Sequence, residues 1–150
     1  MERINFSISI NAPKEKVWKT LWEDATYRKW TSVFSPTSYA DTDWKEGSKV
    51  LFLDGQGSGM VSRIEANRPN KFMSFKHLGE VKNGVEDTES DKVKSWKGAF
   101  ENYTLKEVDG ATELLIEMDA NDNFKGFLLE TFPKAIEQVK ILSERQLNDF

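Results

Sequence analysis

Apolar and polar residues alternate at the start of the chain, which predicts a half-buried strand over residues 3–11. Pro13 suits the first turn of a helix, because its missing N–H would have no partner there. Apolar residues at helical spacing then predict two short helices, the first through Trp22 and the second from Asp24 through Trp30 toward Phe34. The N-terminus is therefore expected to form one strand followed directly by two helices.

Strand patterns and turn residues alternate through the middle of the chain. Four strands are predicted there, at residues 38–44, 48–54, 59–66 and 71–79. Residues 79–94 are polar and acidic, and they are predicted to form a mobile loop. A hairpin is predicted next, with arms at residues 96–108 and 111–121 joined across Asp109-Gly110.

The last predicted element is an amphipathic helix over residues 124–147. Its apolar face comprises Phe124, Leu128, Phe132, Ile136, Val139 and Leu142. Pro133 removes a backbone hydrogen bond within this helix, so a kink or a split is expected there. One long helix laid against a large antiparallel sheet predicts an α+β fold and can enclose an apolar pocket.

Composition and net charge limit the classes of function and the partners that the chain is expected to have. The 150 residues are expected to form one domain, and 12% aromatic residues favour a folded chain over a disordered one. A net charge of −4 gives no reason to expect nucleic acid as a partner. No apolar run approaches the roughly 20 residues that span a bilayer, and the N-terminus lacks a signal peptide pattern, so a cytoplasmic protein without integral membrane association is expected.

Cysteine is absent and histidine occurs once, as His77, so disulfides, thiolate chemistry and a centre with several histidines are excluded within one chain. No metal and no cofactor are therefore expected.

Two segments resemble known binding motifs but lack a residue that each motif requires. Residues 55–59 resemble a phosphate loop but lack its lysine, and residues 119–130 have calcium-loop spacing but carry Phe124 where glycine is needed. A hairpin turn and an Asx-rich helix cap are the preferred interpretations.

Three polar residues are candidates for chemistry. Period two places His77 on the interior face, either as a ligand anchor or as a core histidine paired with a nearby acceptor. If Tyr103 points inward, Glu101 does so too, and a buried carboxylate needs a partner. The opposite register would bury Phe100 and leave Glu101 in solvent, and the sequence leaves both registers open.

Several segments together resemble the START-like or SRPBCC superfamily, which includes birch-pollen-allergen-like proteins and polyketide cyclases. They are residues 8–13 with Val17-Trp18, Trp30, residues 59–75 and residues 110–114. Within that superfamily the chain looks most like bacterial homologues of the C-terminal domain of the ninety-kilodalton heat-shock-protein ATPase activator. The resemblance implies a helix-grip fold, a curved antiparallel sheet wrapped around the C-terminal helix, with two short helices closing one end.

The resemblance also implies a cavity for a small hydrophobic or amphipathic ligand, such as a lipid, a sterol or a polyketide. It supplies no catalytic residues. The candidate ligand-binding residues are Trp30, Phe34, Trp44, Phe52, Phe75, His77, Trp96, Glu101, Tyr103, Met118, Leu128 and Phe132. A chaperone-cofactor-like protein-interaction module is the alternative. A cyclase or hydrolase that uses His77 with Glu101 or Tyr103 is a third hypothesis, and it requires these side chains to converge in a cleft.

Overall fold

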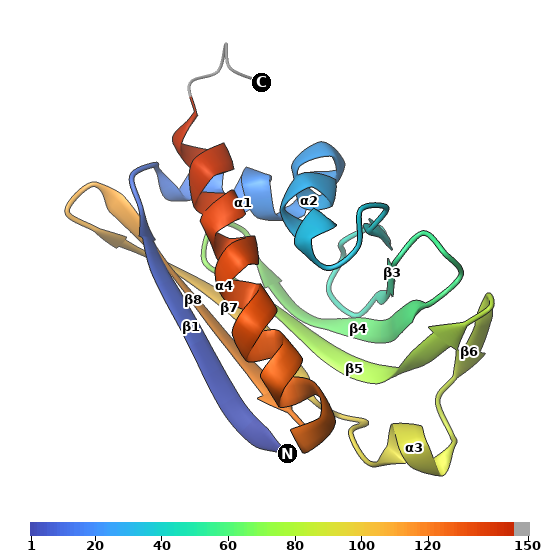
Figure 1. Ribbon diagram of the computed structural model, residues 1–150. Helices are drawn as coiled ribbons and strands as arrows, with labels where there is room; N and C mark the ends of the chain where they lie inside the picture. Colours follow the sequence, from blue (N-terminus) through green and yellow to red (C-terminus); the bar gives the residue numbers. More distant parts are fainter. Residues whose placement is uncertain (146–150) are drawn as a thin grey trace.

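The computed structural model describes residues 1–145, and within them eight antiparallel strands form one sheet (Figure 1). The strand order is β1-β8-β7-β5-β4-β3-β2, and β6 pairs with β5. The strands are β1 (Glu2–Ile10), β2 (Tyr39–Asp41), β3 (Lys49–Leu53), β4 (Gly59–Arg68), β5 (Phe72–Lys82), β6 (Val85–Asp87), β7 (Phe100–Val108) and β8 (Ala111–Ala120). The helices are α1 (Lys14–Trp22), α2 (Asp24–Trp30), the 3-10 turn η1 (Thr31–Val33), α3 (Asp91–Lys94) and α4 (Asp122–Glu144).

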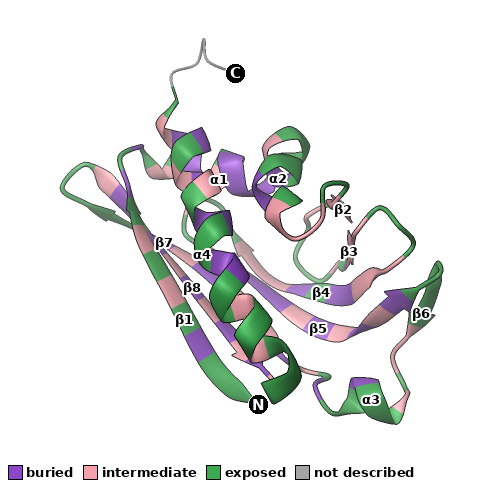
Figure 2. Cartoon of the chain, in the orientation of Figure 1, coloured by how far each residue is buried: buried purple, intermediate pink, exposed green. Residues whose placement is uncertain are grey.

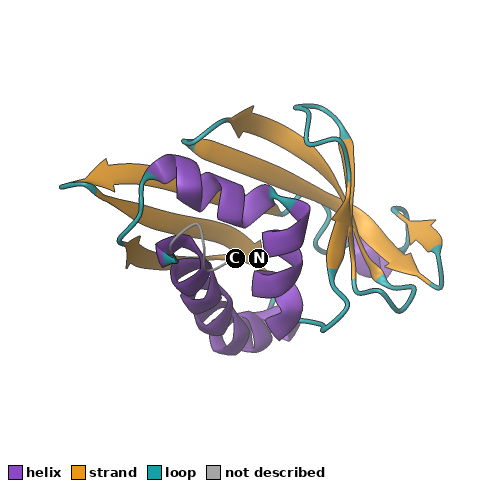
Figure 3. Ribbon diagram, turned by 90° about the horizontal axis from the view of Figure 1, so that it is seen from above, coloured by secondary structure: helices purple, strands orange, loops and turns teal. Residues whose placement is uncertain are grey.

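The sheet bends around the helices. Figure 3 shows α1, α2 and α4 gathered on one side of the strands, and in Figure 1 α4 lies across the sheet with β1 beside it. This arrangement confirms the predicted helix-grip α+β fold, with the two short helices following the first strand.

The predicted alternation sets the inner face of the sheet. Ile4 and Ile10 of β1 are buried, and β8 buries Leu114, Ile116 and Met118. In β7 the register is also settled, because Tyr103 and Leu105 are buried in the core cluster. Of the two registers left open by the sequence, the one with Tyr103 inside is therefore the correct one.

The prediction of a loop over residues 79–94 is wrong. Instead β5 continues to Lys82, turns at Asn83-Gly84 and pairs with β6. Both turn residues have positive φ, 52° and 77°, which asparagine and glycine tolerate best. The short helix α3 then begins at Asp91, and the hydroxyl of Ser90 before it caps the helix by accepting a hydrogen bond from the Val93 amide. The strand predicted from residue 96 accordingly begins only at Phe100.

Helix α4 runs without a break from Asp122 to Glu144, so of the kink or split expected at Pro133 the split does not occur. Pro133 lies on the exposed side of the helix, so the carbonyl group that loses its amide partner faces water. The helix ends at Glu144, and the predicted end at Leu147 lies outside the described residues. Its N-terminal cap is the Asn121 side chain, which confirms the Asx-rich cap expected in place of a calcium loop.

The two parts of α4 differ in burial (Figure 2). Its buried residues all lie at or beyond position 131 and comprise Thr131, Phe132, Ala135, Ile136, Val139, Leu142 and Ser143. By contrast Phe124 and Phe127 are 49% and 51% exposed. The apolar face predicted from Phe124 onward is thus fully buried only in its later part, and in the first turns Leu128 is half-buried while Phe124 and Phe127 stay exposed.

Candidate functional site

A pocket of about 490 Å³ lies between the sheet, the α2–η1 segment and the first turns of α4. Its walls come from α1 and α2, from β3, β4, β5 and β7, and from Phe124, Phe127 and Phe132 of α4. Eleven of its twenty-one lining residues are Trp, Tyr or Phe, so the walls are chiefly aromatic. A concave apolar cavity of this size with a few polar groups is typical of a small-molecule site.

A second pocket of about 240 Å³ adjoins the first along the start of α4. The two share a set of lining residues, namely Met60, His77, Trp96, Glu101, Phe124 and Phe127. The side chains of His77 and Glu101 therefore stand at the boundary between the two spaces.

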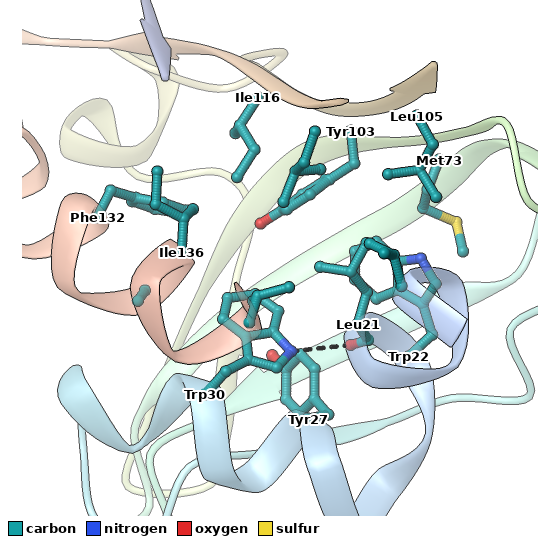
Figure 4. Packing of buried hydrophobic residues seen from close by; sticks show 14 of the residues in the cluster. Leu21, Trp22, Tyr27, Trp30, Met73, Tyr103, Leu105, Ile116, Phe132 and Ile136 are labelled. Atoms are coloured by element: carbon teal, nitrogen blue, oxygen red, sulfur yellow. Dashed lines mark hydrogen bonds between the residues drawn. The ribbon is translucent and has the colours of Figure 1, made fainter. Parts of the chain in front are cut away.

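Several aromatic residues of the pocket wall, among them Trp22, Trp30 and Tyr103, pack closely with other buried side chains (Figure 4). The ring of Trp22 lies 4.8 Å from that of Tyr103 and 5.4 Å from that of Phe75, both nearly perpendicular, which is a favoured edge-to-face geometry. Trp30 is fixed as well, because its indole N–H donates to the carbonyl oxygen of Leu21 at 3.0 Å. This side of the pocket is therefore held by both ring packing and a buried hydrogen bond.

A hydrogen-bonded chain of four side chains crosses the sheet beside this wall. Ser62 of β4 lies opposite His77 of β5, and its hydroxyl oxygen is 2.6 Å from Nδ1 of the imidazole. The other ring nitrogen, Nε2, is 3.1 Å from one carboxylate oxygen of Glu101 on β7. The second carboxylate oxygen accepts a hydrogen bond from the hydroxyl of Tyr103.

A neutral imidazole satisfies every group in this chain. The Ser62 hydroxyl then donates to Nδ1, and the Nε2–H donates to Glu101. Burial, and after it the negative charge of Glu101, raise the pKa of Tyr103 and likewise that of Tyr27. Both phenols therefore stay protonated at neutral pH. Glu101, whose side chain is 21% exposed, thus has a hydrogen-bond donor on each carboxylate oxygen, His77 on one and Tyr103 on the other.

A family model covers most of the chain. The model described as Activator of Hsp90 ATPase homolog 1-like protein matches residues 11–128. The chain belongs to this family. The match confirms the resemblance that the sequence suggested, and a comparison with curated proteins yields no match.

Solved structures share the fold of this activator-like chain. Protein MLL2253 from Mesorhizobium loti is 17% identical, with a TM-score of 0.76 over 97% of this chain and 98% of that chain. The Aha1 dimer from Colwellia psychrerythraea is 21% identical, with a TM-score of 0.72 over 96% of this chain and 97% of that chain. Protein CV1439 from Chromobacterium violaceum is 17% identical, with a TM-score of 0.70 over 97% of this chain and all of that one. At these identities the likeness shows the fold.

Most of the predicted site residues line the pockets of this family member. Those around the larger pocket are Trp30, Phe34, Phe52, Phe75, His77, Trp96, Glu101, Tyr103 and Phe132. Met118 and Leu128 line the smaller pocket. Trp44 lines neither, because its ring packs behind the wall, 5.4 Å from Trp22 and 6.2 Å from Tyr27. The role of each in binding stays a prediction.

Sequence reasoning missed several lining residues and one member of the hydrogen-bonded chain. Trp22 and Tyr27 lie within the two predicted short helices, and like Met60 and Phe127 they carry no sequence signal that separates a pocket wall from ordinary packing. Ser62 was also missed, although it lies directly opposite His77 in the sheet. Two irregularities in the β4–β5 register, one of them at Val61/Ser62, prevented this pairing from being derived by counting residues.

The enzyme hypothesis required His77, Glu101 and Tyr103 to converge, and they do so within hydrogen-bonding distance. Both nitrogens of the imidazole are already engaged, however, and Ser62 is fully buried. The ring therefore offers a substrate no nitrogen unless the chain of hydrogen bonds opens. The arrangement fits a fixed polar wall better than a free general base.

The described part of the chain offers neither a cluster of metal ligands nor a membrane-spanning helix. Across residues 1–145, no three His, Asp or Glu side chains gather closely enough to hold a metal ion. Over the same residues, no helix combines the length and apolar character needed to cross a membrane.

Proposed function

We propose that the chain, acting as a single domain, binds a small apolar or amphipathic molecule in the larger pocket. The observation that carries this proposal is an aromatic-lined space of about 490 Å³ between the sheet and α4. Apolar burial contributes about 25 cal/mol per Å², so a ligand that buries roughly 300 Å² gains about 7.5 kcal/mol before the entropic cost of binding. The carboxylate of Glu101, held in place by His77 and Tyr103, supplies the polar contact that orients it.

An NMR titration with 2-naphthol and decanol tests the proposal. Bound probe should shift the backbone resonances of Phe75, Trp96 and Leu128, which lie around the two pockets. Native mass spectrometry of freshly purified protein should in parallel reveal a retained small molecule. The proposal fails if neither probe moves these resonances up to its solubility limit.

A matched pair of variants separates binding in the pocket from adsorption to exposed apolar surface. Phe127 lines both pockets and is 51% exposed, whereas Val108 is 48% exposed at the far end of β7 and lines neither. Phe127→Ser should weaken probe binding several-fold, and Val108→Ser should leave it unchanged. Equal effects of the two variants would point to nonspecific adsorption.

A protein-interaction function is the second candidate, and two observations favour it. The matching family model is described as Activator of Hsp90 ATPase homolog 1-like protein. The first turns of α4 also carry exposed apolar side chains, Phe124, Phe127 and Leu129. In this case the protein should accelerate ATP hydrolysis by a purified bacterial Hsp90, and Leu129→Ser should weaken the effect. A cytoplasmic location is part of both proposals and stays a prediction.

A further inference from the structure

We infer that the larger pocket selects cationic amphiphiles, molecules in which an ammonium group is attached to an aromatic or aliphatic body. This inference rests on the proposed function, because it names the class of ligand for the same pocket.

The formal charges around the pocket have one sign. Asp54, Glu80 and Glu101 line it, whereas none of its described lining residues is a lysine or an arginine. Besides His77, which contacts Glu101, Lys92 contacts one of these acids, and its ammonium lies 3.5 Å from a carboxylate oxygen of Glu80. Lys92 is itself 68% exposed and stands outside the lining, so it does not bring positive charge into the pocket.

Glu101 lacks a permanent cation as a partner. Its neighbours across the strands are Phe75 on β5 and Met118 on β8, both buried and apolar. The two groups that donate to it are the hydroxyl of Tyr103 and the imidazole of His77, which is neutral in the arrangement described above. A carboxylate offers about four acceptor positions, so each oxygen retains capacity for a donor from a ligand. A carboxylate in apolar surroundings is stabilised when a cation arrives beside it.

The aromatic walls add a second attraction for a cation. Trp30, Trp96 and Phe52 line the same pocket as Glu101. The face of an aromatic ring attracts an ammonium group electrostatically, and tryptophan does so most strongly. Rings and carboxylate together therefore suit a positively charged group attached to an apolar body.

An anionic amphiphile meets the opposite situation. The carboxylate of a fatty acid in this pocket would face Glu101 without a lysine or arginine from the lining to pair with. Like charges at short range in apolar surroundings repel strongly. The charge pattern thus discriminates against fatty acids, although their chains would fit the aromatic walls.

Three probes with the same ring system test the inference by isothermal titration calorimetry at pH 7. They are 2-naphthylmethylamine, 2-naphthylmethanol and 2-naphthoate, which present a cation, a neutral hydroxyl and an anion. The amine should bind at least about tenfold more tightly than the naphthoate and also more tightly than the alcohol. The (2-naphthylmethyl)trimethylammonium ion should retain most of the preference, since charge on aromatic faces needs no N–H donor.

A pair of charge-neutralising variants then assigns the preference to one carboxylate. Glu101→Gln should weaken binding of the amine about tenfold and change that of the alcohol little. Glu107→Gln is the matched control, because Glu107 lies on the same strand but is exposed and outside both pockets. Circular dichroism of each variant verifies folding. If Glu101→Gln does not fold, the comparison of the three probes on the unmodified protein still decides whether the pocket prefers a cation.

The results of these titrations distinguish failure of the cation preference from failure of the proposed ligand-binding function. If the alcohol and the naphthoate bind as tightly as the amine, the pocket binds ligands but the cation preference is refuted. If none of the probes binds, the ligand-binding function itself fails. A preference for the amine that survives Glu101→Gln would overturn the assignment of Glu101 as the selecting group.

Discussion

Replacement of Tyr103 by phenylalanine isolates one hydrogen bond of the buried chain. Tyr103 is 1% exposed, and its hydroxyl donates to the carboxylate of Glu101. The rings of Trp22, Trp30 and Phe75, whose centroids lie 4.8 to 6.4 Å away, stay packed against the new phenyl group. The variant therefore loses a hydrogen bond to a charged acceptor, which contributes roughly 1.5–3 kcal/mol. A chain of this size loses about 2–4 °C of Tm for each kcal/mol, so Tm should fall by about 3–12 °C.

Urea unfolding followed by tryptophan fluorescence measures this change in the free energy of unfolding. Tyr27→Phe is the matched control, because Tyr27 is also buried but its hydroxyl makes no hydrogen bond with any residue in the range 1–145. The control should change the free energy of unfolding by less than about 0.5 kcal/mol. If both variants lose the same amount, the bond between Tyr103 and Glu101 does not stabilise the fold and the reasoning is refuted.

Three further changes test other parts of the structure. Burial raises the pKa of Tyr103 in the folded protein, so above pH 10.0 this phenol ionises only in the unfolded chain. As the pH rises above that value, the free energy of unfolding should fall more steeply for the unmodified protein than for Tyr103→Phe. Glu144→Gln should destabilise by less than about 1 kcal/mol at pH 7. That difference should shrink as the pH falls below 4.5, because the Lys140 ammonium lowers the Glu144 pKa. Gly79→Ala would place Cβ 2.2 Å from the carbonyl oxygen of Asp87, so calorimetry should show a lower Tm.

Much of the fold was predictable from the local pattern of apolar and polar residues, and the one segment discussed below was predicted wrongly for a physical reason. Strands β1 and β8 each bury one face, so period two defined them. The acidic residues of segment 79–94 led to the prediction of a solvent-exposed loop. In the structure Asp87 instead accepts hydrogen bonds from the backbone amides of Glu89 and Ser90. Charged side chains that bind nearby backbone groups stabilise turns, and overall polarity does not distinguish them from charges on a mobile loop.

The site was less predictable than the fold. Trp30 and Phe75 are buried as expected, whereas Phe124, expected on the apolar face of the last helix, is 49% exposed. Whether a ring lines a cavity or fills the core depends on packing that spans several elements. Trp44 illustrates this, because it is aromatic and inward yet packs behind Trp22. The contact between Ser62 and His77 depends on irregular pairing of β4 with β5, and no single segment encodes it.

The uneven burial of α4 has a kinetic consequence. Its later turns are anchored in the core, while residues 122–130 contribute no buried side chain. The first turns can therefore fray while the rest of the molecule stays intact, and such local opening requires far less free energy than global unfolding. Backbone amides of residues 126–130 should exchange with D₂O much faster than those of residues 136–142. A uniform exchange rate along the helix would show instead that its first turns do not open separately from the rest of the fold.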